Sequence, residues 1–453
     1  MLYIIFATTE SGIFGSSTSN NILWKNKDDL QFFKRKTTKT HNVNKRNAII
    51  MGRKTADQFN KPLKNRINVV ISSSKEYRDG FQLFNKLNDA IEWTFNNDNI
   101  ENVYVIGGIN IINETLEKYI PRRIYWNQLL IDESNMNDNI IRFDTTQLKK
   151  YKLYKSQTIN NIVYNKFVVF DKDISEENNY LNLLKNIYIY GEYRNTRNGY
   201  TYSLFGKTLE FDVSNKFPLL TTKKMFLRGI FEELKFFMLG HTDTTELSEK
   251  GIKIWEGNTS REFLDKHGFF HYKTGYMGPM YGYQWRNFNG ENYDQLKKLI
   301  VELKQNSNSR RLLMTTYNPT QSSLGVLYPC HGIVTQFYVN KKNKLSCIMH
   351  QRSADMFLGV PFNIASYSLL LYLICNITGY KPDKLIINFG DIHIYENHIL
   401  QIMTQFYRNY YDFPTLTINK NLTDVDDIEY LNFDDIQINN YMSHPVIKAN
   451  MIA

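Results

Sequence analysis

The sequence predicts two folded domains, an α/β domain built on a mostly parallel sheet followed by an α+β domain. Three observations lead to this prediction. The chain has 453 residues, which at ~150 residues per domain suggests two or three domains. Its N-terminal part alternates short β-branched runs with helical patterns, as parallel sheets with crossover helices do. Beyond a polar stretch at residues 171–179, long apolar helical patterns stand among strand-like runs, which is typical of helices buried on a sheet.

The elements of the first domain follow from local patterns. Strands are predicted at short, apolar, β-branched runs, which occupy residues 2–7, 48–51, 67–72, 103–106 and 124–131. Helices are predicted where apolar residues recur with helical spacing, at residues 28–36 and 87–95. Residues 152–157 and 162–170 flank an Asn-Asn pair. Because Asn tolerates positive φ, we expect a closing hairpin there.

The second domain carries longer apolar segments. Residues 226–239 and 364–377 are predicted as buried helices, and the former has acids in its middle. Strands are predicted at residues 312–316, 333–339, 345–350 and 385–389. We therefore divide the chain into a first domain at 1–171, a linker at 172–179 and a second domain at 180–453.

Composition excludes several classes of protein. Apolar residues make up 42% and charged residues 22% of the chain, which excludes a fully disordered protein. Three cysteines exclude a disulfide framework and fit a reducing compartment. The longest apolar run, residues 368–375, is far shorter than the ~20 residues that span a membrane, and the N-terminus has no signal-peptide pattern. We expect a cytoplasmic protein without a membrane role.

Cys330 is a candidate nucleophile in the second domain. It follows a proline and precedes His331, and a reactive thiolate needs nearby cations or a base to lower its pKa. A single cysteine is nevertheless more often a buried structural residue. We give that interpretation to Cys347 and Cys375, which lie among apolar residues of a predicted strand and helix.

Two groups of polar residues near predicted strand ends are candidates for an anion site. Arg310 and Arg311 follow a serine, and Arg352 stands between Gln351 and Ser353. Arginine forks combined with hydroxyls suit a phosphate dianion. A solvated basic turn is the simpler interpretation of either group alone.

Two further acids are notable for their surroundings. Glu233 lies within an apolar helical pattern, and such an acid is either paired or functional. Asp391 and His393 follow the predicted strand at 385–389, where a polar cluster can line a site. A helix cap formed by Asp391 is the alternative.

In their order along the chain, these motifs resemble thymidylate synthase. The resemblance covers nearly all of residues 180–453. The matching segments are residues 217–224, 227–234, 278–286, 309–311, 329–331, 351–367 and 390–395. It implies an α+β fold, a homodimer and reductive methylation of dUMP to dTMP, with 5,10-methylenetetrahydrofolate as cosubstrate.

The resemblance also implies roles for the matched residues. Cys330 would add to C6 of dUMP, and Glu233, Tyr281 and His331 would order the waters that transfer protons. The dUMP phosphate would be held by Arg197, Arg352 and Ser353, and by Arg310 and Arg311 of the partner subunit. Gln351, Asn363, His393 and Tyr395 would bind the nucleoside, with Asn363 at the uracil edge. Asp355 and Trp255 would contact the folate, and residues 447–453 match a tail that closes over bound ligands.

The first domain has weaker motifs of its own. Residues 51–55 and 105–108 each join a predicted strand to a helix and contain glycine, which lets backbone amides approach a pyrophosphate. Tight packing of the helix on the strand is the alternative. Asp29 and Phe33 lie four apart on one predicted helix face. An acid there is a candidate proton donor, although N-terminal helix acids are common.

These segments in order resemble dihydrofolate reductase over residues 1–171. The matching segments are residues 4–7, 12–15, 28–35, 49–55, 68–73 and 103–108, together with Trp24. By this resemblance Asp29 protonates the dihydropterin, Phe33 packs on the folate and Arg66 grips its glutamate carboxylate. The residues that would bind NADPH are Ala7, Gly15, Arg53, Lys54, Thr55, Ser72, Ser73, Gly107 and Gly108.

Both resemblances together imply a bifunctional folate enzyme that binds dUMP, folates and NADPH and needs no metal. Leu23, Ile109, Asn110 and Asn127 depart from the reductase pattern, so a degenerate, structural first domain is the alternative. We favour an active reductase because Asn127 can still hydrogen-bond Asp29. The net charge of +10 also allows a basic RNA-binding protein, but we find no RNA-recognition motif and expect no nucleic-acid partner.

Overall fold

The computed structural model describes residues 1–16, 23–59, 61–73, 79–134, 136, 139–169 and 176–452. The chain divides into two compact units, the first comprising Met1–Asp173 with Asn397–Tyr407 and the second Ile174–Glu396 with Arg408–Ala453. Of the predicted linker at 172–179, residues 172–175 lie outside the described residues. The prediction is wrong for residues 176–179, because they form the first turn of helix α5 (Glu176–Tyr190).

The first unit is built on a mostly parallel sheet, as predicted. Among the described residues its strand order is β5-β4-β3-β6-β1-β7-β10-β9. The strands are β1 (Leu2–Thr9), β3 (Arg46–Gly52), β4 (Arg66–Ile71), β5 (Phe81–Phe84), β6 (Ile100–Gly107), β7 (Arg123–Leu129), β9 (Tyr151–Ile159) and β10 (Ile162–Val169). Pairing is parallel from β5 to β7 and antiparallel for β10 and β9. Crossover helices therefore connect most strands.

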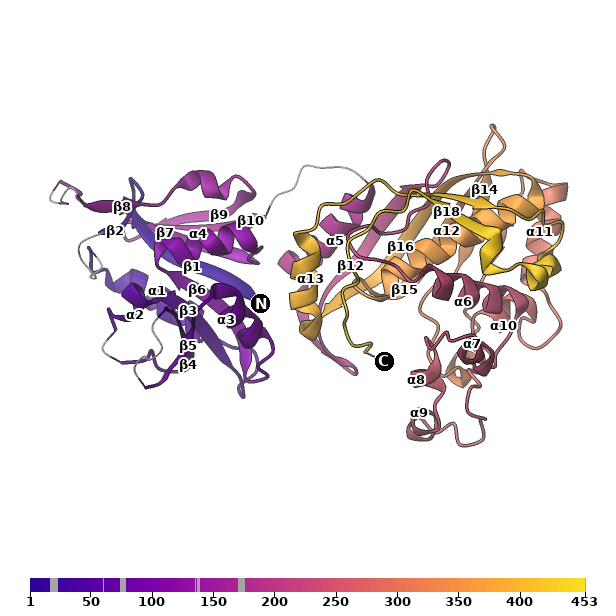
Figure 1. Cartoon of the computed structure of the whole chain (residues 1–453), viewed down its shortest axis with the longest axis horizontal. Coiled ribbons are helices and arrows are strands. Elements are labelled where there is room, and N and C mark those ends of the chain that lie inside the picture. Colours follow the sequence, from indigo (N-terminus) through magenta and orange to yellow (C-terminus); the bar gives the residue numbers. More distant parts are fainter. Residues whose placement is uncertain are drawn as a thin grey trace. The chain divides into compact units, whose positions relative to one another are not determined.

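The helices and turns of this unit confirm most local predictions (Figure 1). The helices are α1 (Lys27–Thr38), α2 (Arg53–Ala56), α3 (Leu87–Phe95) and α4 (Ile109–Lys118). Asn160 and Asn161 have φ of 49° and 59° and close the β9–β10 hairpin. The sequence analysis missed β5 and the small pair β2 (Ile13–Ser16) with β8 (Ile140–Arg142).

The second unit combines a mixed sheet with buried helices. Its main sheet has the order β11-β12-β16-β15-β14-β13 in the described residues. The strands of this unit are β11 (Glu192–Thr196), β12 (Gly199–Asp212), β13 (Leu313–Met314), β14 (Thr335–Val339), β15 (Lys344–Asp355), β16 (Lys381–Tyr395), β17 (Thr415–Ile418) and β18 (Ile436–Asn439). Its helices besides α5 are α6 (Leu227–Leu239), α7 (Thr245–Glu249), α8 (Glu256–Thr259), α9 (Arg261–Lys266), α10 (Gly282–Arg286), α11 (Gln295–Gln305) and α12 (Gly359–Thr378); α13 (Ile399–Phe406) belongs to the segment grouped with the first unit.

Strand β16 corrects the interpretation of Asp391 and His393. The strand was predicted to end at residue 389, but it continues to Tyr395 because Ile392 and Ile394 remain buried and paired with β12. Asp391 is therefore a residue inside a strand and not a helix cap.

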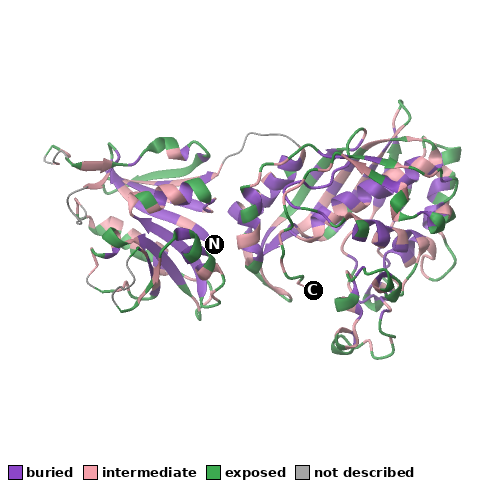
Figure 2. Ribbon diagram, viewed as in Figure 1, coloured by how far each residue is buried: buried purple, intermediate pink, exposed green. Residues whose placement is uncertain are grey.

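Helix α12 is apolar over most of its circumference because it is buried on several sides. It is long and apolar enough to cross a membrane by those criteria alone. Its side chains instead pack within the unit, against β15, β16 and α6, and Figure 2 shows most of it as buried. It is a core helix that packs on the sheet of the second unit.

Candidate active sites

Cys330 lies in a small cluster of aromatic and polar side chains in the second unit. The Tyr281 hydroxyl is 3.3 Å from Cys330 Sγ. Tyr281 has a φ of 37° and precedes α10; its ring stacks on His331 with centroids 4.4 Å apart. His331 Nδ1 in turn lies 3.0 Å from the Tyr367 hydroxyl on α12. Residues distant in sequence thus surround the thiol.

Among the titratable groups around the thiol, Glu233 and His331 have pKa values shifted by burial. Burial raises the pKa of Glu233, on α6, to about 7, while Trp255 Nε1 donates to its Oε1 at 2.8 Å. Burial lowers the pKa of His331 to about 4. Near neutral pH the histidine is therefore neutral, and Glu233 can take up or release a proton.

The pKa of the Cys330 thiol is raised, even though a cation lies near it. Burial raises the pKa of Cys330, and this outweighs the Tyr281 hydrogen bond and the charge of Arg352, which lower it. Arg352 is nevertheless tied to the cysteine loop. Its backbone N–H donates to Cys330 O at 2.7 Å, and its Nε donates to Pro329 O at 3.1 Å.

The register of two parallel strands gathers the residues expected to bind dUMP and folate. Ser353 lies opposite Asp391 and Asp355 opposite His393 on β15 and β16. His393 Nδ1 is 2.8 Å from Asp391 Oδ1, and the rings of His393 and Tyr395 are 5.3 Å apart.

Three other expected residues are fixed by side-chain contacts at the start of α12. Gln351 Nε2 donates to Asn363 Oδ1 at 3.0 Å. Asp355 Oδ1 accepts from Phe357 N at 2.9 Å. The four arginines expected at the phosphate have exposed side chains, and they are Arg197, Arg310, Arg311 and Arg352.

Two residues near this site, Tyr367 and Lys223, were not predicted from the sequence. Tyr367 hydrogen-bonds His331 from the middle of α12, where a tyrosine reads as core. Lys223 is 6% exposed, donates to Phe357 O and lies over the Phe357 ring at 4.1 Å. Burial lowers the pKa of Lys223 to about 7, opposed by Asp355. Neither role has a local sequence signal, because both depend on burial.

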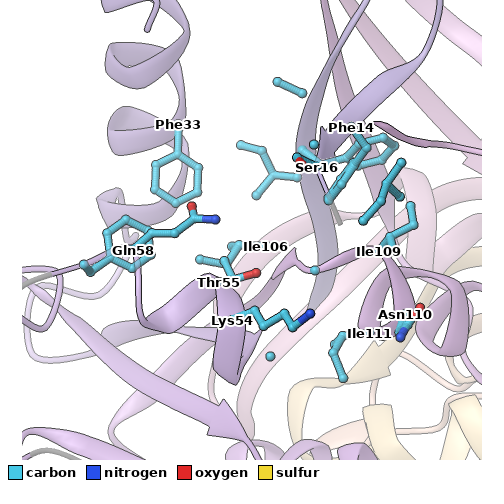
Figure 3. Close-up of a pocket in the computed structure, with 18 of the residues that line it drawn as sticks. Phe14, Ser16, Phe33, Lys54, Thr55, Gln58, Ile106, Ile109, Asn110 and Ile111 are labelled. Carbon is cyan, nitrogen blue, oxygen red and sulfur yellow. The ribbon is translucent and has the colours of Figure 1, made fainter. Parts of the chain in front are cut away.

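The first unit contains a cavity of about 520 Å³ (Figure 3). Of the expected residues, its wall includes Ala7, Gly15, Asp29, Phe33, Arg53, Lys54, Thr55 and Gly108. Phe33 extends from α1 on one side, and Thr55 with Lys54 approaches from α2. The wall also includes residues with no role predicted from the sequence, among them Phe14, Gln58 and Phe59.

Asp29 is the acid of this cavity. Asn26 caps α1 by accepting from the backbone N–H of Asp29, which fixes where the acid emerges from the helix. Asn127 Nδ2 donates to Asp29 Oδ1 at 2.7 Å, as expected from the sequence. Burial raises the pKa of Asp29, and the Asn127 hydrogen bond lowers it. The Asp29 carboxyl therefore lies in a largely apolar cavity wall, and the Asn127 amide fixes its orientation.

Four expected residues do not contribute to the cavity wall. Arg66 donates to Thr37 Oγ1 at 2.8 Å and lies 5.8 Å from the Phe33 ring, so it stands behind a wall residue. Gly107 adjoins Thr55 at the end of β6. Ser72 and Ser73 follow β4 and are not among the described wall residues.

Comparisons with known proteins identify the family of each unit. A thymidylate synthase family model matches residues 178–453, and a dihydrofolate reductase family model matches residues 1–169. The bifunctional dihydrofolate reductase-thymidylate synthase of Paramecium tetraurelia is 37% identical, with 99% of this chain and 98% of that protein covered. The corresponding proteins of Arabidopsis thaliana (number 2) and Leishmania major are 35% and 34% identical, covering 99% and 96% of this chain and 88% and 92% of theirs. The chain belongs to the bifunctional dihydrofolate reductase–thymidylate synthase family.

Proposed function

We propose that the second unit converts dUMP and 5,10-methylenetetrahydrofolate into dTMP and dihydrofolate, and that the first unit reduces this dihydrofolate with NADPH. The observation that carries the first reaction is the Tyr281 hydroxyl at 3.3 Å from the Cys330 thiol. The observation that carries the second is the Asp29–Asn127 pair in the wall of an apolar cavity.

In the synthase reaction, Cys330 Sγ attacks C6 of dUMP. The new S–C6 bond pushes an electron pair to C5, which then attacks the methylene carbon of the cosubstrate as one of that carbon's C–N bonds opens. Loss of the C5 proton, breaking of the second C–N bond and hydride transfer from the tetrahydrofolate ring would give the methyl group and dihydrofolate, and Cys330 would leave C6 as the product forms. Tyr281 and Arg352 stabilise the thiolate, and phosphate binding by the exposed arginines orients the base. Glu233, with a pKa of about 7, moves protons through ordered water near neutral pH.

In the reductase reaction, Asp29 supplies the proton that the dihydropterin needs. Its raised pKa keeps the carboxyl protonated over a wider pH range than an exposed aspartate. Phe33 packs against the pterin from the same helix, and Asn127 holds the carboxyl in place.

The residues at one side of the cavity fit NADPH. Gly108, the N-cap of α4, has no side chain, and a Cβ there would lie 3.4 Å from Thr55 Oγ1. The helix N-terminus and the exposed cations of Arg53 and Lys54 favour phosphate groups. Bound NADPH supplies the hydride. These residues would hold the cofactor beside the folate.

We also propose that the second unit forms a homodimer through one face of its sheet. Leu313 lies opposite Gln336, Gln336 opposite Ile348, and Ile348 opposite Ile386, so this row crosses four strands on one face. Leu313 is 46% exposed, and Tyr338, on the same face, is 65% exposed. Alternate residues of these strands are buried. An uncovered sheet face that carries the exposed side chains of Leu313 and Tyr338 supports pairing with a second copy.

A complementation experiment tests whether this dimer shares its sites. Mixing Cys330→Ala chains with Arg310→Ala chains should produce hybrid dimers with one complete site, and about a quarter of wild-type activity if exchange is statistical. No recovered activity after demonstrated subunit exchange contradicts a shared site.

The three free cysteines and the burial of α12 support a reducing, aqueous compartment such as the cytoplasm. Thiols persist unpaired in such a compartment. The proposed substrates are also water-soluble metabolites.

A coupled assay tests the bifunctional proposal. With dUMP, 5,10-methylenetetrahydrofolate and NADPH, we expect one NADPH to be oxidised for each dTMP formed. Formation of dTMP without NADPH oxidation, even when dihydrofolate is added, selects the alternative of a structural reductase-like unit. Absence of both products contradicts the proposal as a whole.

A further inference from the structure

Glu177, in the first turn of α5, is a buried acid that the proposed reaction does not use. It is 2% exposed. Thr221 donates to its carboxylate from the backbone N–H at 2.9 Å and from Oγ1 at 2.6 Å. Thr222 donates from its backbone N–H at 2.9 Å and from Oγ1 at 2.8 Å. One carboxylate therefore gathers every N–H and O–H of this turn.

The opposite side of the same turn holds the C-terminal segment. Thr221 O accepts from the backbone N–H of His444 at 2.8 Å. Arg408 donates to both Thr222 O, at 2.8 Å, and Pro445 O, at 2.6 Å. The turn thus joins Glu177 to the chain just before residues 447–453, which match a tail that closes over ligands.

The turn also leads directly into the folate end of the synthase site. Lys223, the next residue, donates to Phe357 O. The Tyr180 hydroxyl, three residues after Glu177 on α5, donates to Met356 O at 2.8 Å and so holds the same segment. This segment follows Asp355, the residue expected to contact folate. Glu177 and Tyr180 lie on one helix face. Together these contacts connect the root of the tail, meaning His444 and Pro445, with the residues just before α12.

We propose that Glu177 is a positioning residue for the synthase reaction. It holds the Thr221–Thr222 turn, which is linked by hydrogen bonds to the base of the C-terminal tail, and so positions the tail that closes over the bound folate. The proposal rests on the proposed synthase function, since it needs a tail that closes. It assigns no contact between Glu177 and a substrate.

The physical reason is the direction of the hydrogen bonds. All four groups of the turn that face Glu177 are donors, and a carboxylate offers only acceptors. The isosteric amide of glutamine would set its NH₂ against one pair of these donors, leaving buried groups without partners. The turn would then relax, and the tail root and Lys223 would move with it.

The experiment compares Glu177→Gln with wild type in the full chain. We expect the synthase kcat to fall at least tenfold and the KM for 5,10-methylenetetrahydrofolate to rise at least fivefold, with the Kd for dUMP alone changed less than twofold. We also expect dUMP with dihydrofolate to protect the wild-type tail from carboxypeptidase, and to protect the variant far less. The reductase rate of the same chain should stay constant.

Two further variants keep the result interpretable. Glu176→Gln is the matched control, since Glu176 accepts only from Asp212 N in the described contacts and should leave all readouts unchanged. Thr222→Val removes one donor and keeps the backbone, and should lower kcat about threefold with the same loss of tail protection. Equal tail protection in wild type and Glu177→Gln overturns the proposal, and so does a loss of dUMP affinity as large as the loss of kcat. A wild-type enzyme without dTMP synthesis would instead refute the proposed function.

Discussion

The two units build their sites in different ways. In the second unit the candidate catalytic groups contact one another. The Tyr281 hydroxyl is hydrogen-bonded to Cys330, the Tyr281 ring stacks on His331, and His331 is hydrogen-bonded to Tyr367. In the first unit one polar pair, Asp29 with Asn127, stands in a cavity whose wall is mostly apolar. A site that forms a covalent bond needs its own groups preorganised, whereas a site for hydride transfer needs mainly a shaped cavity for two ligands.

Both units also raise the pKa of a carboxyl group by burial, with different partners. Glu233 accepts from an indole N–H, and Asp29 accepts from a side-chain amide. Burial dominates in both cases. The same physical device therefore prepares a carboxyl group for the proposed proton transfer in each unit, and the two acids can be perturbed separately within one chain.

The change expected to reduce activity most is the removal of the nucleophile, which should affect the second unit and spare the first. Cys330→Ala should lower dTMP formation more than ~100-fold, because no other group can form the bond to C6. Dihydrofolate reduction and dUMP binding should persist, since neither needs the thiol. Cys347→Ala, at a buried strand position, is the control and should reduce stability alone. Residual dTMP formation above about a hundredth of the wild-type rate would refute the assignment of Cys330 as the nucleophile.

The reciprocal change addresses the acid of the first unit. Asp29→Asn should lower NADPH-dependent dihydrofolate reduction by ~100-fold or more near neutral pH, because a carboxamide cannot relay a proton. Synthesis of dTMP should be unaffected. Steady-state rates of both reactions on one preparation provide the measurement, and an unchanged reductase rate would place the acid elsewhere.

A pH titration sharpens the comparison of the two carboxyls. Glu233 has a pKa of about 7 in the folded protein, above its ordinary 4.5. The folded state therefore keeps a proton that the unfolded chain has already lost, and its contribution to stability falls as pH rises from about 4.5 through 7. Glu233→Gln should remove this loss, which is about 3 kcal/mol.

The measurement is the melting temperature of the second unit, recorded at about pH 5 and about pH 9. The transition of this unit is recognised because added dUMP raises its melting temperature. The stability of Glu233→Gln relative to wild type should rise between these pH values, because glutamine resembles the protonated acid. A constant difference would show that the pKa of Glu233 is not raised.

The smallest expected effect concerns recognition of the base. Gln351 donates to Asn363 Oδ1, which opposes a flip of the Asn363 amide. The fixed amide can accept from uracil N3–H and donate to O4, and cytosine mismatches both. Such a mismatch corresponds to roughly 5- to 150-fold discrimination. Asn363→Asp should narrow or reverse the preference for dUMP over dCMP in kcat/KM. An identical ratio in both proteins would show that Asn363 does not read the base.

Elements and motifs that depend on a few neighbouring residues could be predicted from local sequence patterns. The β9–β10 hairpin follows from Asn160 and Asn161, whose side chains tolerate positive φ. The buried helix α6 follows from its apolar pattern, and Cys330 stands out beside proline and histidine. The Asn127–Asp29 hydrogen bond was expected only from the resemblance to dihydrofolate reductase, and the structure confirms it.

Contacts between distant segments could not be predicted in this way, because they depend on how the chain packs. Tyr367 meets His331 and Lys223 meets Phe357 across 36 and 134 residues, and Glu177 meets Thr221 across 44. The continuation of β16 through Asp391 depends on its pairing with β12. Hydrogen bonding and burial are set by which segments pack together, and sheet register fixes that packing across the whole unit. Local patterns carry periodicity and backbone preference, but no information on the partner that a buried polar group will find.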